Sequence, residues 1–205
     1  MNYKVYEEIE IFLKDNMHKK DISKLIDDIN SKAKDINQKQ AVQLYNVYRF
    51  LFDEYGLDEK YIKPDFNKEQ SEILNANLYD FIDKAKKNNW LRNKSANHVG
   101  SGLGRNIPLL IYLGCSKVVG IDFDSKILDI SQSFINLFTF KDRVELINEN
   151  FLDFSGLVCD VFYYIGGTIK LNTSMEMVKF NIAMNKVLQS YETIIYTKDL
   201  FQSFD

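Results

Sequence analysis

The chain has 205 residues, of which 45% are hydrophobic and 14% aromatic, with nine glycines and two prolines. This length and composition suit one folded domain with an appendage, and they exclude collagen-like, low-complexity and disordered classes. The 26 basic and 29 acidic side chains give a net charge of −3, so the chain lacks the excess positive charge that nucleic-acid backbones usually attract.

The chain contains two cysteines, Cys115 and Cys159, which lie far apart in the sequence. We therefore expect neither a disulfide framework nor a metal site, and a reducing compartment is the default. No apolar run approaches the roughly 20 residues that span a membrane. The first residues mix acidic and apolar side chains, unlike a signal peptide. These features predict a cytoplasmic protein without a membrane partner.

The first part of the chain has a helical rhythm. From Tyr3 to about Asn88 apolar residues recur at helical spacing between Lys, Asp, Asn and Gln, which predicts three or four helices. The fourth helix is expected over residues 67–88, with a buried side formed by Ile73, Leu78, Phe81 and Ile82. We expect residues 1–92 to form a helical segment. It would act as a cap that selects substrate, or as a bundle that only covers part of the second half or holds a partner.

After Asn93 the rhythm changes to short apolar runs that alternate with helical patterns. Strands are expected at residues 117–121, 144–147, 158–165 and 193–196, after a short strand near residue 96, and helices at residues 106–113, 126–138 and 174–188. This alternation predicts an α/β fold with a Rossmann-like parallel sheet and flanking helices over residues 93–205. Ligands of such sheets bind at the carboxyl ends of the strands.

The sharpest local pattern is a glycine turn, Gly100-Ser101-Gly102-Leu103-Gly104, between the first expected strand and a helix. Glycines permit backbone angles closed to other residues and let a ligand approach the main chain. The next expected strand ends in Asp122, 18 residues after Gly104. An acid at that strand end is placed to accept hydrogen bonds from both hydroxyls of a ribose. The turn and the acid together predict a nucleoside-binding site.

The spacing of the glycines indicates which nucleoside. A dinucleotide fingerprint has its third glycine five residues after the first, where this chain has Arg105. The G-x-G-x-G form instead resembles motif I of the class I methyltransferases that use S-adenosylmethionine, and the resemblance extends from about Ala96 to about Lys198. It implies that fold, S-adenosylmethionine as cofactor, and a fourth strand whose end faces the transferred methyl.

The resemblance also implies a role for individual residues. The glycines of the turn would line the methionine half of the cofactor, with Ser101 between them, and Asp122 would bind the ribose. Phe123 and Phe151 would pack on the adenine, and Asn150 would accept a hydrogen bond from its amino group. Tyr163 and Tyr164 would border the methyl-transfer site. The cofactor-binding residues are thus expected to be His98, Gly100, Ser101, Gly102, Gly104, Asp122, Phe123, Asn150 and Phe151.

Three features depart from the family pattern. His98 stands two residues before the first glycine, where the family usually has an acid. The fourth strand ends in Tyr-Ile-Gly-Gly, not in the Asn/Asp-Pro-Pro-Tyr/Phe of amino-methyltransferases, which argues against methylation of adenine in DNA. The chain ends at Asp205, so the family's last two strands are expected to be missing. A fainter likeness connects it with the non-SET lysine methyltransferases of histones.

The sequence therefore predicts an S-adenosylmethionine-dependent methyltransferase that works by direct displacement and needs no catalytic triad. Protein lysine, RNA and small molecules all remain open as the methyl acceptor. One alternative is a module that binds the cofactor without turnover, and another is a nicotinamide-dependent oxidoreductase, which Arg105 disfavours. His98 is expected to line the pocket through hydrogen bonds, not to act as a base or metal ligand, and Asp124 is expected to cap a helix.

Overall fold

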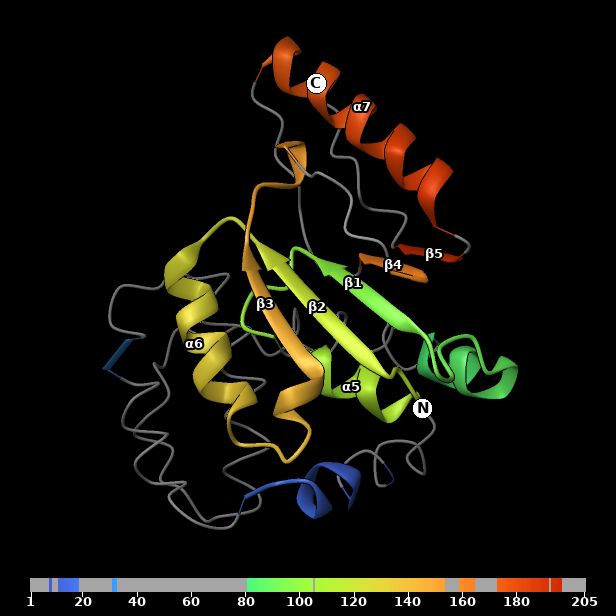
Figure 1. The fold of residues 1–205 in the computed structure, drawn as a ribbon, viewed down its shortest axis with the longest axis vertical. Coiled ribbons are helices and arrows are strands. Elements are labelled where there is room, and N and C mark those ends of the chain that lie inside the picture. The colour runs from blue at the N-terminus through green and yellow to red at the C-terminus, as the bar shows by residue number, and fades with distance from the viewer. Residues whose placement is uncertain are drawn as a thin grey trace, which may run out of the picture.

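The computed structural model describes residue 8 and residues 11–18, 31–32, 81–104, 106–153, 159–164, 173–191 and 193–196. In this part, five parallel strands form one sheet in the order β3-β2-β1-β4-β5 (Figure 1). The strands are β1 (Ser95–Val99), β2 (Lys117–Asp122), β3 (Val144–Asn148), β4 (Val161–Tyr164) and β5 (Thr193–Tyr196). The order reverses direction between β1 and β4, as in Rossmann-like sheets. The predicted fold class is confirmed.

Helices connect the strands in the alternation that the sequence predicts. They are α5 (Ile107–Tyr112), α6 (Ser125–Ile135) and α7 (Ser174–Ser190), with short 3-10 helices η3 (Lys141–Arg143) and η4 (Phe151–Asp153). None of the helices in the described part is long and apolar enough to cross a bilayer. α7 begins with a capping box, in which the side chains of Thr173 and Glu176 each accept from the other's backbone N–H.

α6 ends three residues earlier than expected, because another part of the chain pairs with the residues that follow it. The N–H of His18 donates to the carbonyl of Leu137, and the N–H of Thr139 donates to the carbonyl of Asn16. Met17 and Phe138 form an isolated antiparallel bridge between these two bonds. The apolar periodicity continues through this region, so the sequence alone gave no sign of the change from helix to bridge.

The described N-terminal residues pack into the same core as the sheet. Residues 11–15 and 81–88 are helical. Phe81 and Ile82 are buried, as predicted, whereas Ile73, Leu78 and most of the expected N-terminal helices lie outside the described residues. Met17 belongs to the core cluster that includes Phe81 and Phe138. The division of the chain at residue 92 stays a prediction.

Two apolar clusters cover the two faces of the sheet. The first joins α5, α6 and the helix at residues 81–88 to side chains such as Ala96 and Val118, and the second joins α7 and η4 to Val99 and Val119. Alternate residues of each strand point to opposite faces, which explains this division. α7 lies apart from the other helices in Figure 1, and Met175 near its start is 66% exposed.

Candidate functional site

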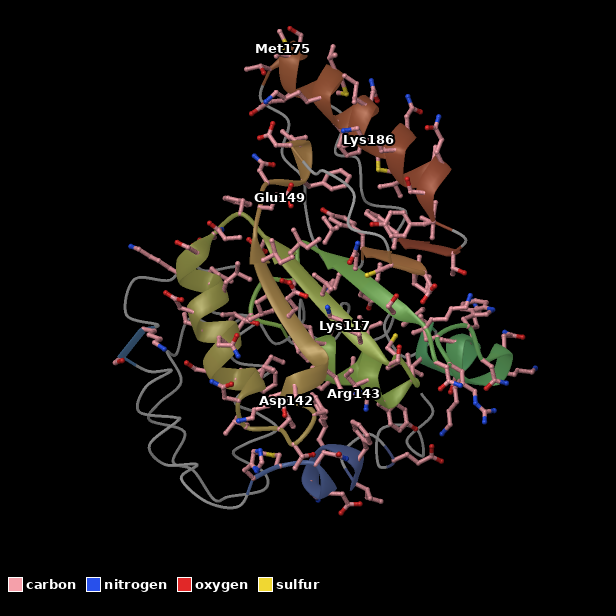
Figure 2. All side chains as sticks on the ribbon, in the orientation of Figure 1. Lys117, Asp142, Arg143, Glu149, Met175 and Lys186 are labelled. Carbon is pink, nitrogen blue, oxygen red and sulfur yellow. The ribbon has the colours of Figure 1, made fainter. Side chains whose placement is uncertain are left out.

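The carboxyl ends of the strands carry the predicted site residues. Figure 2 gives the orientation, because Lys117 begins β2 and Glu149 follows the end of β3. The reversal of strand order between β1 and β4 makes this edge the topological switch point, where open α/β sheets bind ligands. The glycine turn follows β1 directly, at the same edge.

The glycine turn takes a backbone path that only glycine adopts without strain. Gly100 and Gly102 have φ angles of 64° and 54°, in the left-handed region. The N–H of Ser101 donates to the carbonyl of Ile121 at 3.0 Å, and the N–H of Gly104 donates to the carbonyl of Ser101, also at 3.0 Å. These bonds hold the turn against the end of β2. Ser101 is buried, and its hydroxyl has no hydrogen-bond partner among the described residues.

Asp122 joins the turn to the end of β2. Its Oδ2 accepts from the N–H of Gly102 at 2.9 Å, and its Oδ1 accepts from the N–H of Asp124 at 3.1 Å. Burial raises the pKa of the Asp122 carboxyl, and the backbone N–H groups of Asp124 and Gly102 act in the opposite direction. Each carboxylate oxygen has two lone pairs. The carboxylate therefore keeps acceptor capacity for two further donors beyond these contacts.

Gly104 has a packing role that the sequence did not indicate. Its φ is 75°, and a Cβ at this position would lie 2.3 Å from Oγ of Ser131 on α6. Gly120 of β2 is similarly close-packed, since a Cβ there would lie 2.7 Å from Leu146 and 3.2 Å from Oγ of Ser101. The third glycine of the turn thus lets α6 approach closely. Ser131 and Gly120 belong to this arrangement, and nothing in their local sequence singles them out.

The residues expected around an adenine lie at the ends of β2 and β3. Phe123 is 75% exposed. Asn150 is also exposed, and its Oδ1 accepts from the N–H of Leu152 at 3.0 Å, at the start of η4. The backbone links these strand ends, because the N–H of Glu149 donates to the carbonyl of Asp122. Phe151 is instead buried in the second cluster, with its ring 5.9 Å from the ring of Phe162.

The residues expected nearest the reacting methyl are all buried. His98 is 1% exposed, Tyr163 is 0% exposed and Tyr164 is 1% exposed. His98 and Tyr163 face the first cluster with ring centres 5.0 Å apart, whereas Tyr164 faces the second cluster. The structure therefore brings His98 and Tyr163 together and separates them from Tyr164. The roles of all three toward a ligand stay predictions.

The buried imidazole of His98 is uncharged. Burial alone lowers its pKa to about 3, and neither ring nitrogen has a hydrogen-bond partner among the described residues. In the same part of the chain, no three His, Cys, Asp or Glu side chains gather closely enough to hold a metal ion. Asp124 has the role that the sequence predicts, since its Oδ1 accepts from the N–H groups of Lys126 and Ile127 at the start of α6. That prediction is confirmed.

Comparisons with known proteins give structural neighbours only. No family model and no curated protein matches the chain. Among solved structures, it is similar to magnesium protoporphyrin IX methyltransferase (ChlM) from Synechocystis PCC 6803 with bound SAM. This match has a TM-score of 0.48 and 12% identity, and covers 84% of this chain and 82% of that chain.

Two further neighbours are methyltransferases. N-methyltransferase NodS from Bradyrhizobium japonicum WM9, in complex with S-adenosyl-L-homocysteine, matches with a TM-score of 0.47, 13% identity and 74% and 72% of the two chains. An S-adenosylmethionine-dependent methyltransferase from Mesorhizobium loti matches with a TM-score of 0.41, 14% identity and 52% and 46% of the two chains. The chain thus spans about half of the length of the Mesorhizobium loti protein.

Proposed function

We propose that this chain is an S-adenosylmethionine-dependent methyltransferase. The observation that carries the proposal is the hydrogen bond from the N–H of Gly102 to the carboxylate of Asp122 at the carboxyl edge of the sheet. It joins the two sequence features that predict a nucleoside site, the glycine turn and the acid at the next strand end. The spacing of the three glycines, with Arg105 after them, favours this nucleoside over a dinucleotide.

The described residues suit the cofactor. Gly100 and Gly102 offer a main chain without side chains at a left-handed turn, so a ligand can come close to it. Asp122 keeps free acceptor capacity for ribose hydroxyls, and the exposed ring of Phe123 offers an apolar face for a base. Asn150 uses one lone pair of its side-chain oxygen for Leu152, which leaves one for an amino group.

The chemistry requires little of the protein beyond alignment. When bound, the cofactor supplies a methyl group that its positively charged sulfur already activates toward a nucleophile. The chain's residues would bind the nucleoside and hold it in one orientation, which is the contribution that proximity makes to such reactions. No catalytic triad is required. Protein lysine, RNA and a small molecule all remain candidate acceptors.

One structural observation favours a second candidate, a module that binds the cofactor without turnover. The last two residues of β4, Tyr163 and Tyr164, are fully buried in opposite clusters, so neither presents a side chain to an acceptor. Transfer of labelled methyl to any acceptor would exclude this candidate. We also place the protein in the cytoplasm, a proposal that the two free, buried cysteines support.

The first experiment is thermal unfolding with and without S-adenosylhomocysteine, with NADH as the control ligand. A ligand at a hundred times its dissociation constant stabilises a protein by about 2.7 kcal/mol. For a chain of this size the midpoint would rise by roughly 5–10 °C. A rise with S-adenosylhomocysteine alone supports the proposal. A rise with NADH alone would support the oxidoreductase instead, and no rise with either would contradict both.

A further inference from the structure

His98 is a buried polar residue without a hydrogen bond. It is 1% exposed, and neither Nδ1 nor Nε2 has a partner among the described residues. More than nine in ten buried polar groups in folded proteins are paired, and an unpaired one costs stability. The exception therefore needs a physical reason.

Packing does not supply that reason. The imidazole meets the ring of Tyr163 edge-on at 5.0 Å, and Tyr163 meets the ring of Phe81 at 5.5 Å. These are apolar, aromatic surroundings, which a phenylalanine would fill equally well without a desolvation cost. Burial also keeps the imidazole uncharged, so it offers one donor and one acceptor nitrogen. Both nitrogens are therefore available to a ligand.

The position of His98 supplies the reason. In the sheet register His98 lies opposite Gly120 of β2 on one side and Tyr163 of β4 on the other, at the switch point. Two residues later the glycine turn begins, and Asp122 ends the neighbouring strand β2. A nucleoside whose ribose is bound at Asp122 has two directions along the strand ends. The direction toward the switch point leads over β1 and its buried imidazole.

We propose that His98 determines ligand specificity, by forming an uncharged hydrogen bond with the polar group that follows the ribose of the bound nucleoside. This inference rests on the proposed function, because it takes the ribose position from Asp122. It extends that function in one respect. The chain would distinguish a nucleoside with an amino-acid end from one without it by hydrogen bonding, at the expense of its own stability before binding.

The test compares two thioether nucleosides on the full chain by calorimetry. S-adenosylhomocysteine carries an amino-acid group beyond its sulfur, and 5′-methylthioadenosine carries only a methyl group there. His98→Phe keeps an aromatic ring between Tyr163 and Phe81 and removes both nitrogens. We expect this variant to bind S-adenosylhomocysteine roughly ten- to hundredfold more weakly, as the loss of one or two hydrogen bonds implies. Its affinity for 5′-methylthioadenosine should stay within about threefold of wild type.

Two controls separate a specific effect from a general one. His98→Gln keeps an uncharged donor and acceptor, so it should retain more S-adenosylhomocysteine affinity than His98→Phe. Tyr191→Phe removes a buried hydrogen bond to Asn97, the neighbouring residue of β1, on the opposite face of the sheet. It should leave both affinities unchanged. The unfolding midpoint of each free variant shows that it is folded.

The outcomes are distinct. A selective loss of S-adenosylhomocysteine binding in His98→Phe supports the inference. Equal affinities in wild type and His98→Phe, or an equal loss for both nucleosides, would overturn the inference and leave the proposed function intact. If the wild-type chain bound neither nucleoside, the proposed function would fail, and the inference with it.

Discussion

The carboxylate of Asp122 and the backbone N–H of Gly102 are joined by a hydrogen bond of 2.9 Å. The two residues are 20 positions apart, one at the end of β2 and the other in the turn after β1. Asp122 also accepts from the N–H of Asp124, which precedes α6. One half-buried carboxylate thus connects the glycine turn, a strand end and a helix start, and a ligand at this edge would meet all three.

Replacement of this carboxylate should remove ligand binding and leave the fold. Asp122→Ala abolishes the acceptors proposed for the ribose, and hydrogen bonds to charged groups contribute about 1.5–3 kcal/mol each. We expect the dissociation constant for S-adenosylhomocysteine to rise at least about tenfold by calorimetry. Asp129→Ala, which removes an exposed acid on α6, is the matched control and should bind normally. An unchanged dissociation constant in Asp122→Ala would show that the ribose is not held there.

A methyl group at Gly104 should destabilise the chain. Its φ of 75° disfavours any residue with a Cβ, and that Cβ would lie 2.3 Å from Oγ of Ser131. The left-handed backbone alone costs about 1–2 kcal/mol. We expect Gly104→Ala to lower the free energy of unfolding by at least this amount in urea denaturation.

A double variant separates the two causes at Gly104. Ser131→Ala removes the clashing oxygen and leaves only Cβ, which would lie 3.5 Å from the new methyl group. In combination with Gly104→Ala it should restore the part of the stability lost to the clash and none of the part lost to the backbone. An unchanged unfolding free energy in Gly104→Ala would contradict both causes.

The sequence predicted the sheet well, because its strands are short apolar runs between polar turns. Four strand ranges and three helix ranges agree with the structure to within a few residues, and β4 is shorter than the expected 158–165 within the described part. The residue pattern also placed Asp122 at a strand end and Asp124 at a helix start. These predictions depend only on neighbours in the sequence.

Contacts between distant segments could not be predicted in the same way. The packing of Gly104 against Ser131, the burial of Phe151 beside Phe162 and the end of α6 at the Met17 bridge each depend on how separate elements come together. Likewise, the position of His98 before the turn indicated a pocket wall with hydrogen bonds. The structure instead shows an imidazole enclosed by aromatic rings, because its side of β1 faces the first cluster.

The free protein should lose stability in mild acid because of His98. Its pKa is about 3 in the folded chain against 6.5 in the unfolded chain, so between these values the unfolded state binds the extra proton. Stability therefore rises with pH across this interval, is complete above about 6.5, and falls by roughly 1 kcal/mol for each pH unit below it. Urea denaturation at several pH values measures this slope.

His98→Phe identifies the group responsible for the slope. The variant removes the titrating group, so its unfolding free energy should fall less steeply as the pH is lowered from 6.5. It should also exceed that of wild type at neutral pH, because two unpaired buried nitrogens are gone. Tyr191→Phe retains His98 and should keep the wild-type slope. Parallel pH profiles for wild type and His98→Phe would show that another group is responsible.

Neighbouring acids at the end of β2 should separate stability from binding. Asp124 caps α6 by accepting from Lys126 and Ile127, whereas Asp122 contacts the turn. Asp124→Ala should therefore lower the unfolding free energy by about 1 kcal/mol, as loss of an N-cap does. Its affinity for S-adenosylhomocysteine should stay within about threefold of wild type, since the backbone N–H that it donates to Asp122 remains. A loss of binding as large as that of Asp122→Ala would mean that the helix start, and not the Asp122 carboxylate, holds the ligand.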